Sequence, residues 1–216
     1  MERNEIPGQG ACRIESGFWN RYIGVIRNGV IPYQWDILND RREDAEPSHA
    51  IDNFRIAAGE MEGAFYGQVF QDSDVYKWLE AVGNILMLER DSHLEEQADS
   101  LIDLIVKAQE PDGYLDTYFT IREPDKKWSD LLECHELYCA GHMIEGAIAY
   151  YQATGKEKIY RAACRLADYL TQIFGQEEGK MHGYPGHQEI ELALLKLYEV
   201  SGEEQYLSLI HLSEPT

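Results

Sequence analysis

The sequence has no long hydrophobic run and few basic residues. None of its apolar stretches approaches the ~18 consecutive residues that a membrane-spanning helix needs. Its 19 Lys and Arg stand against 39 Asp and Glu, which gives a formal net charge of −20. Nucleic acid and anionic lipid surfaces are bound through clustered basic residues, so we expect neither as a partner. A neutral substrate fits this charge balance better.

Cysteines are few and lack the spacing of a metal site. Cys12, Cys134, Cys139 and Cys164 form no CxxC pair, so we expect buried thiols rather than disulfides or a zinc knuckle. The start of the chain, MERNEIPGQGACRIESGFW, has no basic region followed by an apolar one. No secretion signal is visible there, and a cytoplasmic location is predicted.

What the chain does have is a helical period from residue 74 onward. Apolar residues recur at three- and four-residue spacing in four stretches, as on the buried face of a helix. These residues are Val75, Trp78, Leu79, Val82, Ile85 and Leu86; Leu94, Ala98, Leu101, Ile102 and Ile105; Met143, Ile144, Ala147, Ile148 and Tyr151; and Tyr160, Ala163, Ala167, Leu170 and Ile173. A fifth stretch, EIELALLKLY, is apolar nearly all round, which predicts a helix enclosed on most sides.

Short joints divide these helices into hairpins. SHLE at 92–95, TGKE at 154–157 and SGEE at 201–204 each match the capping-box pattern S/T-x-x-E. In that pattern the hydroxyl and the acid bond free amides at a helix start. Joints this short require the flanking helices to run antiparallel. The sequence therefore predicts an all-α fold with three helix hairpins.

Long connections separate one hairpin from the next. Short joints at one end and long loops at the other indicate a ring of hairpins, an α/α toroid. The long loops would gather where the first helix of each hairpin begins. The segments FQDSD (70–74), CHE (134–136) and GHQE (186–189) open these helices. Because helix N-termini present free N–H groups, their convergence predicts a polar pocket at the mouth of the ring.

Two histidines are the preferred functional residues of this pocket, His135 and His187. For Asp72 and Ser73 we expect helix capping rather than substrate contact. His142 lies seven residues after His135 and is interpreted as a core histidine with satisfied polar atoms. A metal site in HELYCAGH is not expected, because the zinc motif HExxH needs its histidines four residues apart.

Six stretches of the chain, taken in order, resemble glycoside hydrolase family 127. They are SGFWNRYIGVIRNGVIPYQWDILND, SHAIDNFRIAAGE, FYGQVFQDSDVYKWLEA, AQEPDGYLDTYF, HELYCAGHMIEGAIAYYQATGK and GYPGHQEIELALLKLYEVSGEEQYL. The resemblance extends from Ser16 to about Leu209, and the FQDSDVYKWLE block is highly specific. Enzymes of this family are non-reducing-end β-L-arabinofuranosidases. The resemblance implies an incomplete (α/α)6 barrel, of which three hairpins are present.

The resemblance also implies roles for particular residues. His135 and His187 match family histidines that hold the arabinofuranose, so both are expected to bind an arabinofuranosyl-containing saccharide. The family's retaining chemistry uses a cysteine thiolate held on zinc and a glutamate as acid/base. None of the four cysteines matches the family's zinc cluster. We therefore expect no catalytic residue and no metal ligand in this chain, which alone should be inactive and bind no zinc.

Three segments are expected. Residues 1–73 lead into the barrel, 74–209 form its first hairpins, and 210–216 are a tail foreign to the protein, because LSLIHLSEPT leaves the helical pattern. The expected function is that of the N-terminal part of a retaining β-L-arabinofuranosidase. Two alternatives stay open: an enzyme acting on a different furanose or a deoxy-sugar, and a non-catalytic helical module that binds a sugar or a partner.

Overall fold

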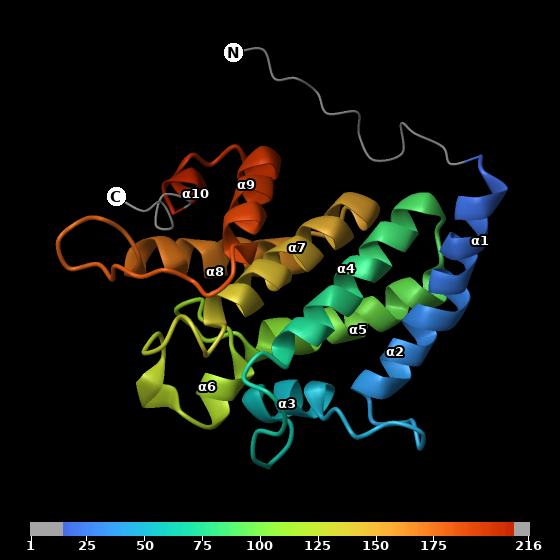
Figure 1. Ribbon diagram of the computed structural model, residues 1–216, viewed down its shortest axis with the longest axis horizontal. Coiled ribbons are helices and arrows are strands. Elements are labelled where there is room, and N and C mark those ends of the chain that lie inside the picture. The colour runs from blue at the N-terminus through green and yellow to red at the C-terminus, as the bar shows by residue number, and fades with distance from the viewer. Residues whose placement is uncertain (1–14, 210–216) are drawn as a thin grey trace.

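The protein is built from helices in the part of the chain that the computed structural model describes, residues 15–209 (Figure 1). Within that range one isolated β-bridge joins Phe174 to Met181. The helices are α1 (Gly17–Val25), the π-helical turn η1 (Ile26–Val30), α2 (Ile31–Leu38), α3 (Ala50–Ala57), α4 (Asp72–Leu88), α5 (Ser92–Ala108), α6 (Thr117–Ile121), the 3₁₀ turn η2 (Pro124–Lys126), α7 (Glu136–Thr154), α8 (Lys158–Ile173), α9 (Glu189–Ser201) and α10 (Gln205–Ser208).

The predicted hairpins are present. α4 pairs with α5, α7 with α8, and α9 with the short α10, and the joints fall at residues 89–91, 155–157 and 202–204. The all-α prediction is thus confirmed for residues 15–209. The predicted tail at 210–216 and Cys12 lie outside the described residues.

The first predicted capping box names the wrong capping residue. α5 is capped by Asp91, one residue before the expected Ser92. The Asp91 carboxylate accepts hydrogen bonds from the backbone N–H groups of His93 and Leu94. The Asp91 carboxylate therefore bonds the free amides for which the prediction used the Ser92 hydroxyl.

The other two joints mark helix ends rather than helix starts. Thr154 ends α7, and its hydroxyl donates to the carbonyl of Tyr150. The hydroxyl of Ser201 accepts an N–H inside its own joint. Gly155 and Gly202 follow these residues with φ of 74° and 76°, the left-handed conformation with which helices commonly end. The Thr-Gly and Ser-Gly pairs therefore mark the C-terminal ends of α7 and α9.

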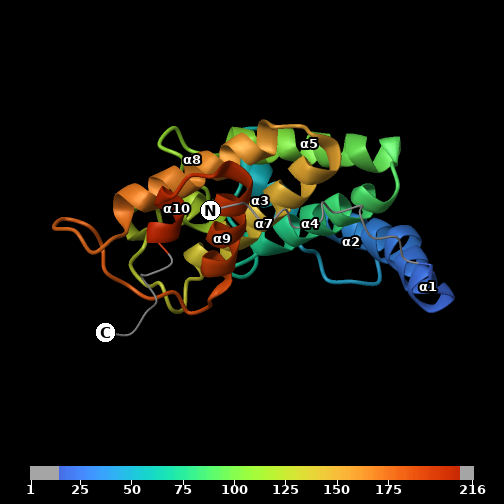
Figure 2. The same ribbon diagram turned by 90° about the horizontal axis from the view of Figure 1, so that it is seen from above.

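The first helices of the hairpins form one layer and pack at very short range. α4 lies against α7, and α7 against α9, while α5 and α8 run along one side of this row (Figure 2). A Cβ at Gly146 of α7 would lie 2.7 Å from the Tyr76 carbonyl oxygen of α4. One at Gly83 of α4 would lie 2.6 Å from the Ala149 backbone. Glycine at these positions lets the helix backbones touch.

The N-terminal helices were not predicted. Regular helix was expected only from residue 74, yet α1, η1 and α2 form a continuous helical run over residues 17–38, and α3 follows. The helical period of this run was not recognised in the sequence because many of its large apolar side chains face solvent. The π-helical turn also shifts the 3.6-residue period in the middle of the run. Along residues 15–209, no helix combines the length and hydropathy required to span a bilayer.

Candidate functional site

Three helix starts meet at one place, as the sequence predicts. Phe70 precedes α4, His135 is the N-cap of α7, and His187 precedes α9. The imidazole of His135 is stacked on the Phe70 ring, with centroids 5.2 Å apart, and meets His187 edge to face at 4.9 Å. The convergence of His135 and His187 in one cluster confirms the predicted geometry, while their role stays a prediction.

Tyr138 is the hub of this cluster. Its ring centroid lies 5.9 Å from that of His135, 5.0 Å from His187 and 4.5 Å from His142. Lys77 of α4 fixes its position by donating a hydrogen bond of 2.7 Å to the Tyr138 hydroxyl. The sequence analysis missed Tyr138 because an aromatic residue in a helix is ordinarily a core residue. Its spacing of three from His135 was the available signal.

His142 belongs to the cluster, so its interpretation as a satisfied core histidine was wrong. Its Nδ1 lies 3.3 Å from Glu189 Oε1 without hydrogen-bond geometry, and no other described residue bonds to it. His135 Nδ1 is likewise buried and has no hydrogen-bond partner in the described part of the chain. Burial, aided by the positive charge of Lys77, lowers the pKa of His142 to about 4, so this imidazole is neutral at neutral pH.

Asp72 and Ser73 do not cap their own helix, contrary to expectation. The Asp72 carboxylate is buried and accepts hydrogen bonds from the Thr117 N–H, at 2.7 Å, and from the Thr117 hydroxyl. It thereby ties the start of α4 to the start of α6. Burial raises the pKa of Asp72 to about 6, against the two bonds from Thr117. The Ser73 hydroxyl accepts from Lys77.

Glu136, the residue after His135, holds the long loop that precedes α7. Its carboxylate accepts 2.7 Å hydrogen bonds from the Tyr114 hydroxyl and from the Trp128 backbone N–H. Burial raises the pKa of Glu136 to about 7, although both bonds oppose the rise. A buried acid directly after His135 therefore holds the loop that leads into α7.

A charged layer lies farther along α4, α7 and α9. Glu145 of α7 is buried and forms an ion pair with Lys196 of α9. Burial raises the pKa of Glu80 and Glu189, and the nearby charge of Glu145 raises both further. The acids thus repel one another across three helices, and Lys77 and Lys196 offset part of that repulsion.

The described cysteines do not fit a zinc site. Burial raises the pKa of the Cys134, Cys139 and Cys164 thiols in the absence of a metal. Over residues 15–209, none of them belongs to a group of three ligand atoms close enough to share an ion. The zinc chemistry implied by the family resemblance therefore finds no ligand set among these thiols.

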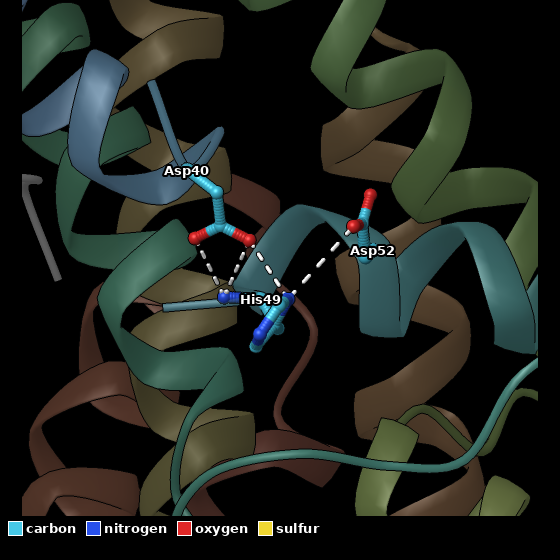
Figure 3. Close-up of side chains that lie close together, drawn as sticks. All are labelled: Asp40, His49 and Asp52. Carbon is cyan, nitrogen blue, oxygen red and sulfur yellow. Dashed lines mark hydrogen bonds and ion pairs between the residues drawn. The ribbon is translucent and has the colours of Figure 1, made fainter. Parts of the chain in front are cut away.

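One cluster in the described range brings three possible ligand atoms together: Asp40, His49 and Asp52 (Figure 3). His49 Nδ1 lies 2.8 Å from Asp40 Oδ2 and 4.0 Å from Asp52 Oδ2. The Asp40 carboxylate also accepts the N–H groups of Ser48 and His49, and Arg55 binds Asp52 at 2.7 Å. The His49 imidazole thus lies between two carboxylates. Protein donors satisfy these acids, so the cluster joins α2 to α3.

Known proteins resemble this chain in sequence and fold. The family model described as beta-L-arabinofuranosidase, GH127 catalytic domain, matches residues 11–212. A curated relative, the non-reducing end beta-L-arabinofuranosidase of Bifidobacterium longum subsp. longum, is 46% identical over 214 residues, and the match covers 91% of this chain and 32% of the relative.

Two solved structures superpose closely. A GH127 beta-L-arabinofuranosidase from Geobacillus stearothermophilus T6 is 61% identical with a TM-score of 0.91, over 93% of this chain and 32% of that one. A second GH127 beta-arabinofuranosidase is 31% identical with a TM-score of 0.86, over 95% and 33%. The chain spans about a third of the length of these proteins. From the family match, the identity and the shared helices together, this chain belongs to the GH127 beta-L-arabinofuranosidase catalytic-domain family.

Proposed function

We propose that the cluster at the three helix starts binds a terminal β-L-arabinofuranosyl residue, with His135 and His187 as its hydrogen-bonding contacts. The observation that carries this proposal is the paired imidazoles, 4.9 Å apart and edge to face. The buried Nδ1 of His135 has no hydrogen-bond partner among residues 15–209. An unpartnered buried nitrogen is costly unless a ligand supplies the bond. Sugar hydroxyls both donate and accept, so they suit imidazole nitrogens in either tautomer.

The aromatic members of the cluster support the same ligand. Phe70 and Tyr138 present ring faces beside the two histidines, and such faces pack against the C–H groups of a sugar ring. Lys77 holds the Tyr138 hydroxyl, which keeps that ring in place before a ligand arrives. The net charge of −20 suits a neutral saccharide and opposes a polyanion.

In this proposal the chain provides sugar binding within a β-L-arabinofuranosidase, and the nucleophile and acid/base are not among its described residues. The high pKa of Cys134, Cys139 and Cys164 argues against a thiolate nucleophile here. Zinc, where the enzyme uses it, would hold its thiolate through residues other than Cys134, Cys139 and Cys164. The cytoplasmic location stays a prediction from the sequence.

A chimera tests the proposal. Residues 15–209 would replace the matching third of the Geobacillus enzyme, and kcat/KM would be measured with an aryl β-L-arabinofuranoside. We expect His135→Ala and His187→Ala to lower kcat/KM by roughly 10–1000-fold, because each removes a contact to the reacting sugar.

The matched control is His93→Ala, because His93 is exposed at the start of α5. This variant should keep the activity of the unmodified chimera, and circular dichroism should show the same helix content for all variants. Unchanged kcat/KM in both cluster variants would refute the role of these histidines. An active chimera that prefers another furanoside would move the assignment to the related enzymes considered above.

A further inference from the structure

The loop between α3 and α4, residues 58–71, carries an exposed aromatic side chain close to the three helix starts. Tyr66 is 54% exposed, and Phe70, four residues later, stacks on His135. Four residues of chain span at most ~14 Å, and the loop lies beside the start of α4 (Figure 1). Exposure alone is ordinary for a single tyrosine, whereas the way in which this residue is held is not.

A buried asparagine fixes the backbone of Tyr66. Asn53 of α3 is 0% exposed; its Nδ2 donates to the Tyr66 carbonyl oxygen at 2.8 Å, and its Oδ1 accepts the Tyr66 N–H at 3.1 Å. One side chain thus bonds both backbone polar groups of one loop residue. The preceding residue, Phe65, is buried and packs edge to face on Tyr118, with ring centroids 5.1 Å apart. The same fixed backbone therefore buries Phe65 and exposes Tyr66.

The ring of Tyr66 is held as well. It meets the His49 imidazole edge to face, with centroids 4.5 Å apart and an interplanar angle of 78°. The imidazole Nδ1 lies 2.8 Å from Asp40 Oδ2 (Figure 3). This contact covers at most one face of the Tyr66 ring, and the His49 side chain is itself 37% exposed. Among the described residues, a face of Tyr66 and part of the His49 imidazole are therefore open to a ligand.

The end of the loop is tied to the segment that carries His49. Gln71 Nε2 donates to the Ser48 hydroxyl at 3.1 Å, and Gln71 Oε1 accepts the Gln68 N–H at 3.3 Å. Gly67 follows Tyr66 with φ of 106°, and a Cβ there would lie 2.6 Å from Gln71 Oε1. The loop is thus closed tightly on itself, and a ligand that packs on Tyr66 does not have to order it.

We propose that Tyr66 binds the leaving saccharide, the sugar unit to which the terminal arabinofuranosyl residue is linked. This inference rests on the proposed function, because the terminal residue must occupy the cluster with His135 and His187. A tyrosine ring face packs against the C–H groups of a sugar ring, and the neighbouring His49 imidazole suits sugar hydroxyls. The preferred substrate is then a neutral saccharide of at least two units rather than a glycoside of a simple alcohol.

Two substrates separate the leaving saccharide from the terminal residue. The Geobacillus chimera described above would be assayed with methyl β-L-arabinofuranoside and with a disaccharide that links the same residue to a second L-arabinose. Tyr66→Ala should lower kcat/KM for the disaccharide about tenfold, mainly through KM, and change it for the methyl glycoside by less than about twofold. Tyr66→Phe should keep both values within about twofold, because the ring remains.

Met61→Ala is the matched control, because Met61 is 43% exposed in the same loop and has no aromatic ring. It should leave the ratio of the two kcat/KM values unchanged. Equal losses on both substrates in Tyr66→Ala would overturn the proposal, since they would show that Tyr66 supports the fold or the terminal sugar instead. No loss on either substrate would overturn it as well.

His135→Ala separates this inference from the proposed function. It should lower kcat/KM for both substrates by the same factor, because both carry the terminal residue. Unchanged activity in His135→Ala would refute the proposed function. The ratio of the two substrates in Tyr66→Ala decides about the leaving saccharide.

Discussion

His135 and His142 lie on the same helix, two turns apart, and their surroundings give them different properties. His135 sits at the N-cap with φ of 59°, beside two ring faces and next to the polypeptide that precedes α9. His142 is held deeper, where burial lowers its pKa to about 4. Sequence spacing placed both residues correctly. It could not give the polar surroundings of His142, since these depend on Glu189 and Lys77 from other helices.

Glu136 should give the protein a recognisable pH dependence. Its pKa is about 7 in the folded chain and ordinarily 4.5, so the folded state binds a proton that the unfolded state has released. Stability from this group is therefore full below pH 4.5 and is lost as the pH rises to about 7. Relative to Glu136→Gln, the parent chain should gain on the order of 1–3 kcal/mol as the pH falls across that window.

Urea titrations from pH 4.5 to 7.5 would measure this difference. Glu133→Gln is the control, because Glu133 is exposed three residues earlier, and its curve should run parallel to that of the parent. A constant difference between the parent and Glu136→Gln at every pH would show that Glu136 is ionised throughout.

At the scale of helices, the sequence predicted α4, α5, α7, α8 and α9 because their buried faces repeat with the helical period. The predicted helix caps were wrong because a capping box is defined by a short local sequence. In the structure Asp91 starts α5, and Gly155 follows the last residue of α7. The N-terminal run was missed because many of its large apolar side chains are exposed, so its apolar residues do not mark one buried face. The tie between Asp72 and Thr117 spans 45 residues and has no local signal.

Glycine contacts set the spacing of the inner helices, so Gly146→Ala should destabilise the protein by about 1–3 kcal/mol. The added methyl group would lie 2.7 Å from the Tyr76 carbonyl oxygen, and backbone cannot rotate away as a side chain could. Gly24→Ala is the matched control, because a Cβ at this helical position meets nothing within 4 Å. It should be neutral or stabilising by up to about 1 kcal/mol. Equal denaturation midpoints for the two variants would contradict close contact between α4 and α7.

At the scale of the whole molecule, the excess of acids makes self-repulsion a general destabilising force. The formal charge is −20, and repulsion between exposed charges weakens as salt shortens the screening length. Raising NaCl from ~10 mM to ~300 mM should therefore raise Tm by roughly 2–5 °C. Scanning calorimetry at matched pH would measure it.

A charge-reduced variant tests the cause. Glu133→Lys combined with Glu178→Lys changes two exposed acids and lowers the excess negative charge by four, from −20 to −16. It should melt higher than the parent at low salt and gain less from added NaCl. A Tm that falls with salt would mean that the surface ion pairs outweigh the repulsion.

The left-handed backbone conformation of His135 lowers thermal stability, whereas its imidazole is the group proposed to bind the sugar. A side chain with a β-carbon pays about 1 kcal/mol in that conformation, and glycine does not. His135→Gly should therefore melt above His135→Ala, although both lose the imidazole, and differential scanning calorimetry would rank them. The reverse order would show that the position is unstrained. A laboratory screen for heat resistance alone would select glycine at this position. A screen for sugar binding would select histidine.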